Sequence, residues 1–124
     1  MQPVLVLRIM LYVQFILGLI AYAGKFVGIQ VGRGVLDFHG SLGILIAIVA
    51  IVVLRPIAGV PTSGMRTVAR FFPLVPLAFG LGFMFHMLGG NGPIGIHMLL
   101  GIITIGLVEA ASAGQRRALR RSKA

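Results

Sequence analysis

The stretch FHGSLGILIAIVAIVVL, residues 38–54, decides the fold of this chain. Apart from His39 and Ser41, it consists of apolar residues and glycine, and its length approaches the roughly 20 residues that an α-helix needs to cross a bilayer. The whole chain has 58% hydrophobic and 10% charged residues and a mean hydropathy of +1.05. A soluble domain carries about 25% charged residues, so the composition predicts an integral membrane protein.

Four apolar segments of this kind follow one another, at residues 5–27, 37–54, 70–88 and 94–113. In hydrocarbon every backbone N–H and C=O needs a partner, which favours helices. No segment alternates apolar and polar residues as the strand of a membrane barrel would. We therefore predict an all-α, four-helix transmembrane bundle, with one transmembrane domain over 1–114 and a basic cytoplasmic tail over 115–124.

The net charge of +9 carries an orientation signal. The loop between the first two helices holds Lys25 and Arg33. The other cations fall near the two termini and the loop between the second and third helices: Arg8, Arg55, Arg66, Arg70, Arg116, Arg117, Arg120, Arg121 and Lys123. Since cytoplasmic loops are enriched in Lys and Arg, both termini are expected in the cytoplasm, in a cell inner membrane. We interpret the charge in this way and expect no nucleic-acid partner. The tail is also suited to anionic headgroups or an acidic partner subunit.

Three histidines share one end of this predicted bundle, near the outer face. His39 opens the second helix, His97 opens the fourth, and His86 ends the third. The sequence around His97, IHMLLGI at 96–102, matches FHGSLGI at an offset of 58 residues. This match predicts two repeated helical hairpins that bring His39 and His97 face to face.

The repeated unit is His-x-x-x-Gly, with Gly43 four residues after His39 and Gly101 four residues after His97. Residues four apart lie on one helix face, so each glycine leaves backbone bare beside an imidazole. Two such helices can clamp a flat macrocycle, as expected for b-type haem with two histidine ligands. The predicted cofactor site is therefore His39, His97, Gly43 and Gly101, with the two histidines as metal ligands. The alternatives are a helix-capping histidine and glycines that serve helix packing alone.

Other polar residues are open to several interpretations. His86 is a further candidate for the cofactor site, as a third ligand or a partner of a haem propionate, or it faces the wet boundary. We expect Glu109 to pair with Arg116 or a neighbouring arginine. Asp37 is expected to cap the second helix or to pair with Arg33 or Lys25.

At His39 and His97 the chain resembles one four-helix half of the haem A synthase family, and half-size members exist. The resemblance extends over essentially the whole chain, in helix count, orientation and the two histidines, and implies that His39 and His97 ligate haem. The chain departs from the family at Leu36 and Gly40, where a glutamate and an arginine are usual. The resemblance thus implies the haem-clamping architecture more than the oxidation of a haem methyl group.

Together these features predict a b-type haem-binding, electron-transfer subunit of a respiratory or photosynthetic membrane complex, more a binding protein than an enzyme in itself. The alternatives are a cofactor-free accessory subunit, a haem-modifying enzyme, and a subunit that binds a chlorophyll-type tetrapyrrole. Besides the lipid bilayer, the expected partners are other membrane subunits or a second copy of the chain.

Overall fold

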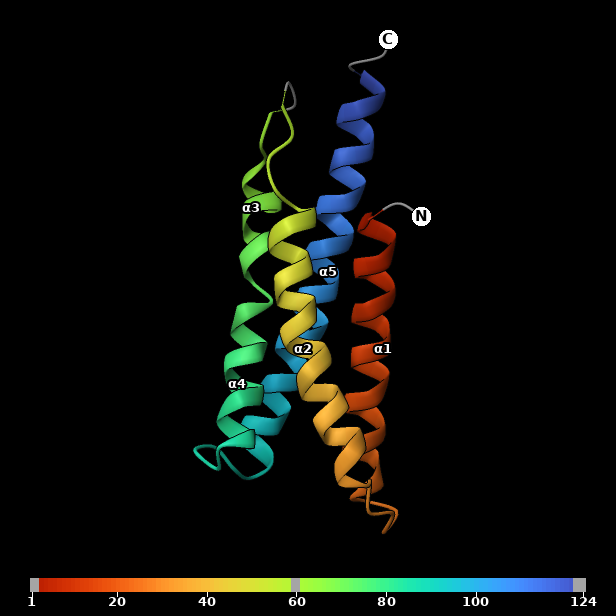
Figure 1. Cartoon of the computed structure of the whole chain (residues 1–124), viewed down its shortest axis with the longest axis vertical. Coiled ribbons are helices and arrows are strands. Elements are labelled where there is room, and N and C mark those ends of the chain that lie inside the picture. The colour runs from red at the N-terminus through yellow and green to blue at the C-terminus, as the bar shows by residue number, and fades with distance from the viewer. Residues whose placement is uncertain (1–2, 59–60, 122–124) are drawn as a thin grey trace.

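The computed structural model of the chain describes residues 3–58 and 61–121, and within these ranges it contains helices and no strand (Figure 1). The helices are α1 (Pro3–Gly24), α2 (Arg33–Val53), α3 (Gly64–Phe71), α4 (Leu74–Met84) and α5 (Asn91–Arg121). The predicted all-α class is confirmed.

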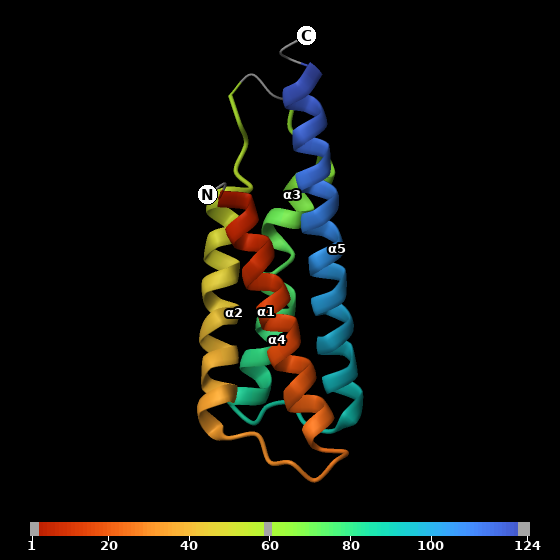
Figure 2. The ribbon, with the colours of Figure 1, turned by 90° about the vertical axis from the view of Figure 1, so that its right-hand side faces the viewer.

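Four stretches of the described chain are long and apolar enough to cross a membrane: α1, α2, the Gly64–Met84 stretch that contains α3 and α4, and α5. The chain is therefore described as a multi-pass membrane protein. It runs up and down, so that the start of α1 and the end of α5 lie at one end of the bundle. The loops 25–32 and 85–90 lie at the opposite end (Figures 1 and 2).

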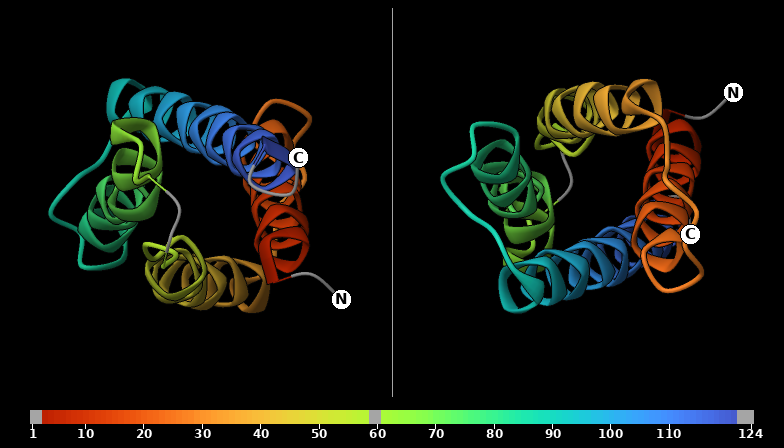
Figure 3. Two further views of the ribbon diagram at one scale, coloured as in Figure 1. Left: turned by 90° about the horizontal axis from the view of Figure 1, so that it is seen from above. Right: turned by 90° about the horizontal axis from the view of Figure 1, so that it is seen from below.

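Seen along its axis, the bundle is a ring (Figure 3). α1 packs against α2 and α5, and α4 packs against the same two helices. α2 and α5 consequently face each other across the ring, and both run in the same direction. This arrangement places the two histidine-bearing helices on opposite sides of one interior.

The third span differs from the single helix predicted over 70–88. It begins six residues earlier, where the Ser63 hydroxyl accepts a hydrogen bond from the amide of Arg66 at 3.2 Å, and it is interrupted after Phe71. Pro73 and Pro76 lack the N–H groups that would continue the hydrogen-bond ladder. α3 and α4 are therefore stacked end to end within one span.

The end of α4 also differs from the prediction, because the helix stops at Met84 and not at residue 88. His86 has a φ of 57°, in the left-handed region. The amides of Met87 and Leu88 turn back to the carbonyl of Gly82, at 2.8 and 3.0 Å. These bonds are typical of a helix C-terminus closed by a left-handed residue.

The remaining boundaries shift mainly outward. α2 begins at Arg33 instead of residue 37, and α5 begins at Asn91 and continues to Arg121. The first part of the predicted tail is thus a helical continuation of the last span, which projects beyond the bundle (Figure 1). The end of the tail, with Lys123, lies outside the described residues.

The packed core lies in the half of the bundle near the termini. Its buried side chains come from α1, α2, α3 and α5 and from the residue after α2: Leu7, Leu11, Ile46, Ala50, Leu54, Ala69, Val108 and Ala111. No member of this cluster comes from α4, in the part of the chain that the structure describes. The half of the bundle near His39 and His97, where α4 lies, therefore does not share this packed core.

Arg66 of α3 closes the end of α2 inside this core. Its side chain is buried, and the guanidinium donates to the carbonyls of Val53, Leu54 and Arg55 at 2.8–3.3 Å, as well as to Gln115 Oε1 of α5. The last carbonyls of a helix have no partner within the helix. Arg66 satisfies them and ties three helices together.

Candidate functional site

His39 and His97 occupy equivalent positions in two helices that run in the same direction. Each lies six residues after the first residue of its helix, Arg33 in α2 and Asn91 in α5. The two imidazole rings meet across the ring of helices, with centroids 6.1 Å apart and planes at 67°. The structure therefore brings together the two histidines that the sequence repeat singles out.

The two rings line one cavity of the bundle. α1, α2, α4 and α5 all contribute to its wall. The polar side chains among the lining residues are Gln14, His39, His97 and Thr104. Thr104 Oγ1 donates to the carbonyl of Leu100 at 2.7 Å and so satisfies itself within α5. The polar lining side chains that are left to contact a bound ligand are therefore Gln14, His39 and His97.

These three side chains carry buried atoms that lack a partner. In the described ranges, no hydrogen bond reaches Nδ1 of His39, Nδ1 of His97 or Oε1 of Gln14. Leaving a buried polar atom unpaired costs about 1–3 kcal/mol, and such atoms are uncommon in folded proteins. Their gathering around one cavity is the strongest structural sign of a ligand-binding site in this chain.

The ring separation fits a metal held between two imidazoles. A metal–imidazole bond is about 2 Å long and a ring nitrogen lies about 1.1 Å from the ring centre, so two imidazoles that share one metal have centroids within about 6 Å of each other. The observed 6.1 Å agrees with this distance. Two imidazoles are also the number that a haem iron accepts on its two open faces. The donor set and its spacing therefore fit haem.

The two predicted glycines have different surroundings. A Cβ atom on Gly101 would meet nothing within 4 Å, so this position leaves open space beside the cavity. A Cβ atom on Gly43 would instead lie 3.2 Å from Nε2 of Gln14, a residue of α1. Both glycines line the cavity, but Gly43 makes room for a protein side chain.

Glycines on the neighbouring helices contact the histidine rings directly. A Cβ atom on Gly18 of α1 would lie 3.1 Å from Cε1 of His39, and one on Gly80 of α4 would lie 3.5 Å from Cε1 of His97. Phe83 packs edge-on against His97, with centroids 5.8 Å apart. Each histidine therefore rests on the helix that precedes its own.

His86 is separate from this site. It lies in the turn after α4, its side chain is exposed, and it is not among the cavity-lining residues. The structure gives no support to its assignment as a third ligand. Its left-handed backbone assigns it a local role in ending α4.

Gln14 is the site residue that the sequence analysis missed. It contributes the only carboxamide of α1, and its side chain reaches His39 on α2, where Nε2 donates to the His39 carbonyl at 2.9 Å. A polar residue in the middle of an apolar span is a functional candidate by default. That signal was present in the sequence, but the partner of Gln14 lies on another helix.

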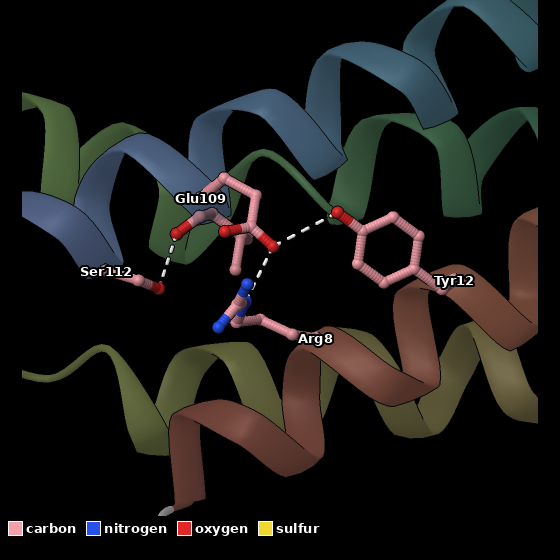
Figure 4. A network of polar contacts seen from close by, with 5 residues as sticks. Arg8, Tyr12, Glu109 and Ser112 are labelled. Atoms are coloured by element: carbon pink, nitrogen blue, oxygen red, sulfur yellow. Dashed lines mark hydrogen bonds and ion pairs between the residues drawn. The ribbon is translucent and has the colours of Figure 1, made fainter.

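The two carboxylates of the chain lie away from the cavity. Glu109 of α5 pairs with Arg8 of α1 at 2.6 Å and accepts a hydrogen bond from Tyr12 at 3.2 Å (Figure 4). The expected pairing with Arg116 or a neighbouring arginine is therefore wrong. Asp37 does not cap α2, because that helix begins at Arg33 and its N-cap residue is Gly32.

Comparisons of the chain with models of known protein families, with curated proteins and with solved structures found no match. The resemblance to the haem A synthase family therefore remains an expectation from the sequence.

Proposed function

We propose that the chain is an integral membrane protein that binds b-type haem between His39 and His97 and acts as an electron-transfer subunit of a respiratory or photosynthetic membrane complex. One observation carries the proposal: two imidazoles from equivalent positions of two facing helices lie 6.1 Å apart in an apolar cavity. That spacing suits two ligands of one iron.

Bound haem would supply an iron that accepts and releases a single electron. The chain's own residues have three tasks around it. His39 and His97 ligate the iron from α2 and α5. Gly101 leaves space for the ring, since nothing lies within 4 Å of its missing Cβ. The apolar side chains of the cavity exclude water, and such burial is one of the factors that tune a redox potential.

The proposal includes the orientation of the chain across the membrane, which the distribution of arginines supports. The end of the bundle that carries the termini holds most of the described cations, with Arg55, Arg66 and Arg70 near the 54–63 loop and four arginines at the end of α5. By the positive-inside rule this end is cytoplasmic, in a cell inner membrane. His39 and His97 then lie toward the outer face.

We do not extend the proposal to catalysis, because an enzyme acting on haem needs an acid or base near the ring. Asp37, the carboxylate nearest to His39 in sequence, does not line the cavity. Electron transfer requires that the iron be ligated and the haem be buried. His39 and His97 supply the ligands, and the apolar cavity wall supplies the burial.

The test is the absorption spectrum of the protein purified from its native membrane, oxidised and then reduced with dithionite. We expect a sharp α-band of b-type haem that is lost in His39→Ala and in His97→Ala. His86→Ala is the matched control and should keep the band, because His86 is exposed outside the cavity.

Other spectra would point to the alternatives. A far-red band that does not respond to dithionite would indicate a chlorophyll-type tetrapyrrole. A spectrum without bands, from protein isolated with its membrane partners, would contradict the cofactor and leave an accessory subunit as the explanation.

A further inference from the structure

The end of α5 extends beyond the packed bundle as a continuous helix (Figure 1). α5 has 31 residues and α1 has 22 residues, which correspond to about 46 Å and about 33 Å of helix. The hydrocarbon core of a bilayer is about 30 Å thick. α1 therefore matches the core, whereas the last turns of α5, residues 114–121, lie at the level of the headgroups and just beyond them.

This extension carries four arginines on one face, which we call the arginine face: Arg116, Arg117, Arg120 and Arg121. At 3.6 residues per turn they fall within an arc of about 140°. All four residues are exposed. The extension thus presents a continuous basic surface to its surroundings.

The opposite face of the extension is held by the segment that leads into α3. Gly114, Gln115 and Ala118 line a small pocket together with residues of that segment and of α3: Ile57, Pro61, Thr62, Ser63 and Arg66. Arg66 also donates a hydrogen bond to Oε1 of Gln115. These contacts fix the rotation of the extension, so the arginine face is turned away from the protein.

The chain itself has no carboxylate left to neutralise the arginine face. Its two acidic residues are Asp37 and Glu109. Asp37 lies in α2, near the opposite end of the bundle. Glu109 is paired with Arg8 at 2.6 Å and accepts a hydrogen bond from Tyr12 at 3.2 Å. Since like charges four residues apart on a helix repel each other, the arginine face favours fixed anions from outside the chain.

Other cations at this end of the bundle favour lipid as the source of these anions. Arg8 lies on α1, Arg55 follows α2 and Arg70 lies on α3. Arg55 is exposed, and the other two are partly exposed. Because these helices and α5 surround the bundle axis (Figure 3), the cations face several directions. Lipid headgroups surround a membrane protein in the same way, whereas a docked protein covers one side.

We infer that the arginine face binds the phosphate groups of anionic phospholipids in the leaflet around the end of the bundle that carries the termini. A guanidinium group binds phosphate through paired N–H donors. Clusters of arginine directly beyond a membrane span are suited to anionic headgroups. The inference is independent of the proposed haem, because His39 and His97 lie toward the other end of the bundle.

The absence of tryptophan from the sequence allows a single fluorescent reporter to be placed beside this face. Ala110→Trp places it at an exposed position of α5, about two turns before Arg117 on the same helix face. Ile96→Trp places a reporter at an exposed position near the other end of α5. Each full-length variant is reconstituted in bilayers of equal phosphatidylglycerol and phosphatidylcholine. Quenching is then measured with bromine on the acyl chains of one lipid or the other.

We expect phosphatidylglycerol to associate beside the Ala110→Trp reporter about 5-fold more strongly than phosphatidylcholine. The Ile96→Trp reporter should show a smaller preference, and added salt should weaken the preference at Ala110→Trp, because mobile ions screen the charges. Equal quenching by the two lipids at Ala110→Trp would overturn the inference, and an acidic protein would then be the better candidate for the counter-charge.

Two double variants in the Ala110→Trp background test the arginine face itself. Arg117→Gln with Arg121→Gln removes two of its cations, and we expect most of the 5-fold preference to be lost. Lys25→Gln with Arg33→Gln removes two exposed cations at the opposite end. This matched control should keep the preference. An unchanged preference in the arginine variant, or an equal loss in both variants, would contradict binding at the arginine face.

Discussion

At the scale of single residues, the surroundings of His39 are tighter than those of His97. The position of a Cβ atom on Gly18 is 3.1 Å from the His39 ring, whereas the equivalent position on Gly80 is 3.5 Å from the His97 ring. The first distance requires a neighbour to move, and the second is an ordinary van der Waals contact. The same substitution should therefore have unequal effects at the two glycines.

We predict that Gly18→Ala lowers haem affinity about 10-fold or more, because the added methyl group displaces His39 from its position opposite His97. Gly80→Ala should leave the affinity near that of wild type. The measurement is a haem titration of both variants, with circular dichroism to confirm that each retains its helices. Equal affinities in the two variants would contradict this difference between the two histidine sites.

The sequence allowed part of this site to be predicted at residue scale. His39 and His97 carry a visible repeat, since each is followed by Leu-Gly-Ile at the same spacing. No sequence repeat relates Gln14 or Gly18 to His39, because the three residues lie on two different helices. Contacts between helices follow no sequence period. Gly43 lines the cavity, but the atom nearest to its missing Cβ belongs to Gln14.

At the scale of helices, Arg66 is the residue on which the packed half depends most. Its guanidinium satisfies carbonyls at the end of α2 and contacts Gln115 of α5, and its side chain is buried. Removal of the guanidinium leaves several buried carbonyls without partners, and each such loss costs about 1–3 kcal/mol.

We predict that Arg66→Leu lowers the free energy of unfolding by about 3 kcal/mol or more, because it removes a charge-assisted bond to three consecutive carbonyls. Arg66→Lys should recover only part of the loss, since an ammonium lacks the planar fork of donors. Arg117→Leu, at an exposed position of α5, is the control. The measurement is the unfolding midpoint in detergent. A midpoint equal for Arg66→Leu and Arg117→Leu would show that the cap is dispensable.

The number of spans and their helical structure could be predicted from the composition. The helix boundaries could not, because they depend on contacts between residues of different helices and loops. The run of apolar residues in each span predicted a helix directly. The third helix was predicted to begin at residue 70, but in the structure the span begins at Gly64, because Ser63 caps an earlier turn and Arg66 holds that turn in the core. α4 ends early because His86 adopts a left-handed backbone conformation. Such a conformation is usual for glycine, so the histidine at this position did not predict it.

At the scale of the whole molecule, the bundle divides into a packed half and a hollow half. The buried side chains gather near the end with the termini, and the cavity with His39 and His97 lies toward the end with loops 25–32 and 85–90. The packed half supplies rigidity. The hollow half supplies the space for a ligand, and Leu11 and Ile46 belong both to the packed core and to the cavity wall.

The orientation of the whole molecule can be tested through the absence of cysteine from the sequence. We predict that Gln30→Cys, in the loop 25–32, is labelled in intact cells by a maleimide that does not cross membranes, because the positive-inside rule places this loop outside. Ala58→Cys, exposed at the opposite end, should react only after permeabilisation. The reverse pattern of labelling would mean that the termini and the arginine-rich end face outward.

The most direct test of the central claim is the electron paramagnetic resonance spectrum of the oxidised, purified protein. Two imidazoles on one ferric haem iron give a low-spin signal, and loss of either ligand leaves a high-spin iron or no haem. We predict a low-spin signal in wild-type protein that is replaced in both His39→Ala and His97→Ala. A high-spin signal in wild-type protein, or a low-spin signal that survives either substitution, would contradict a haem held between His39 and His97.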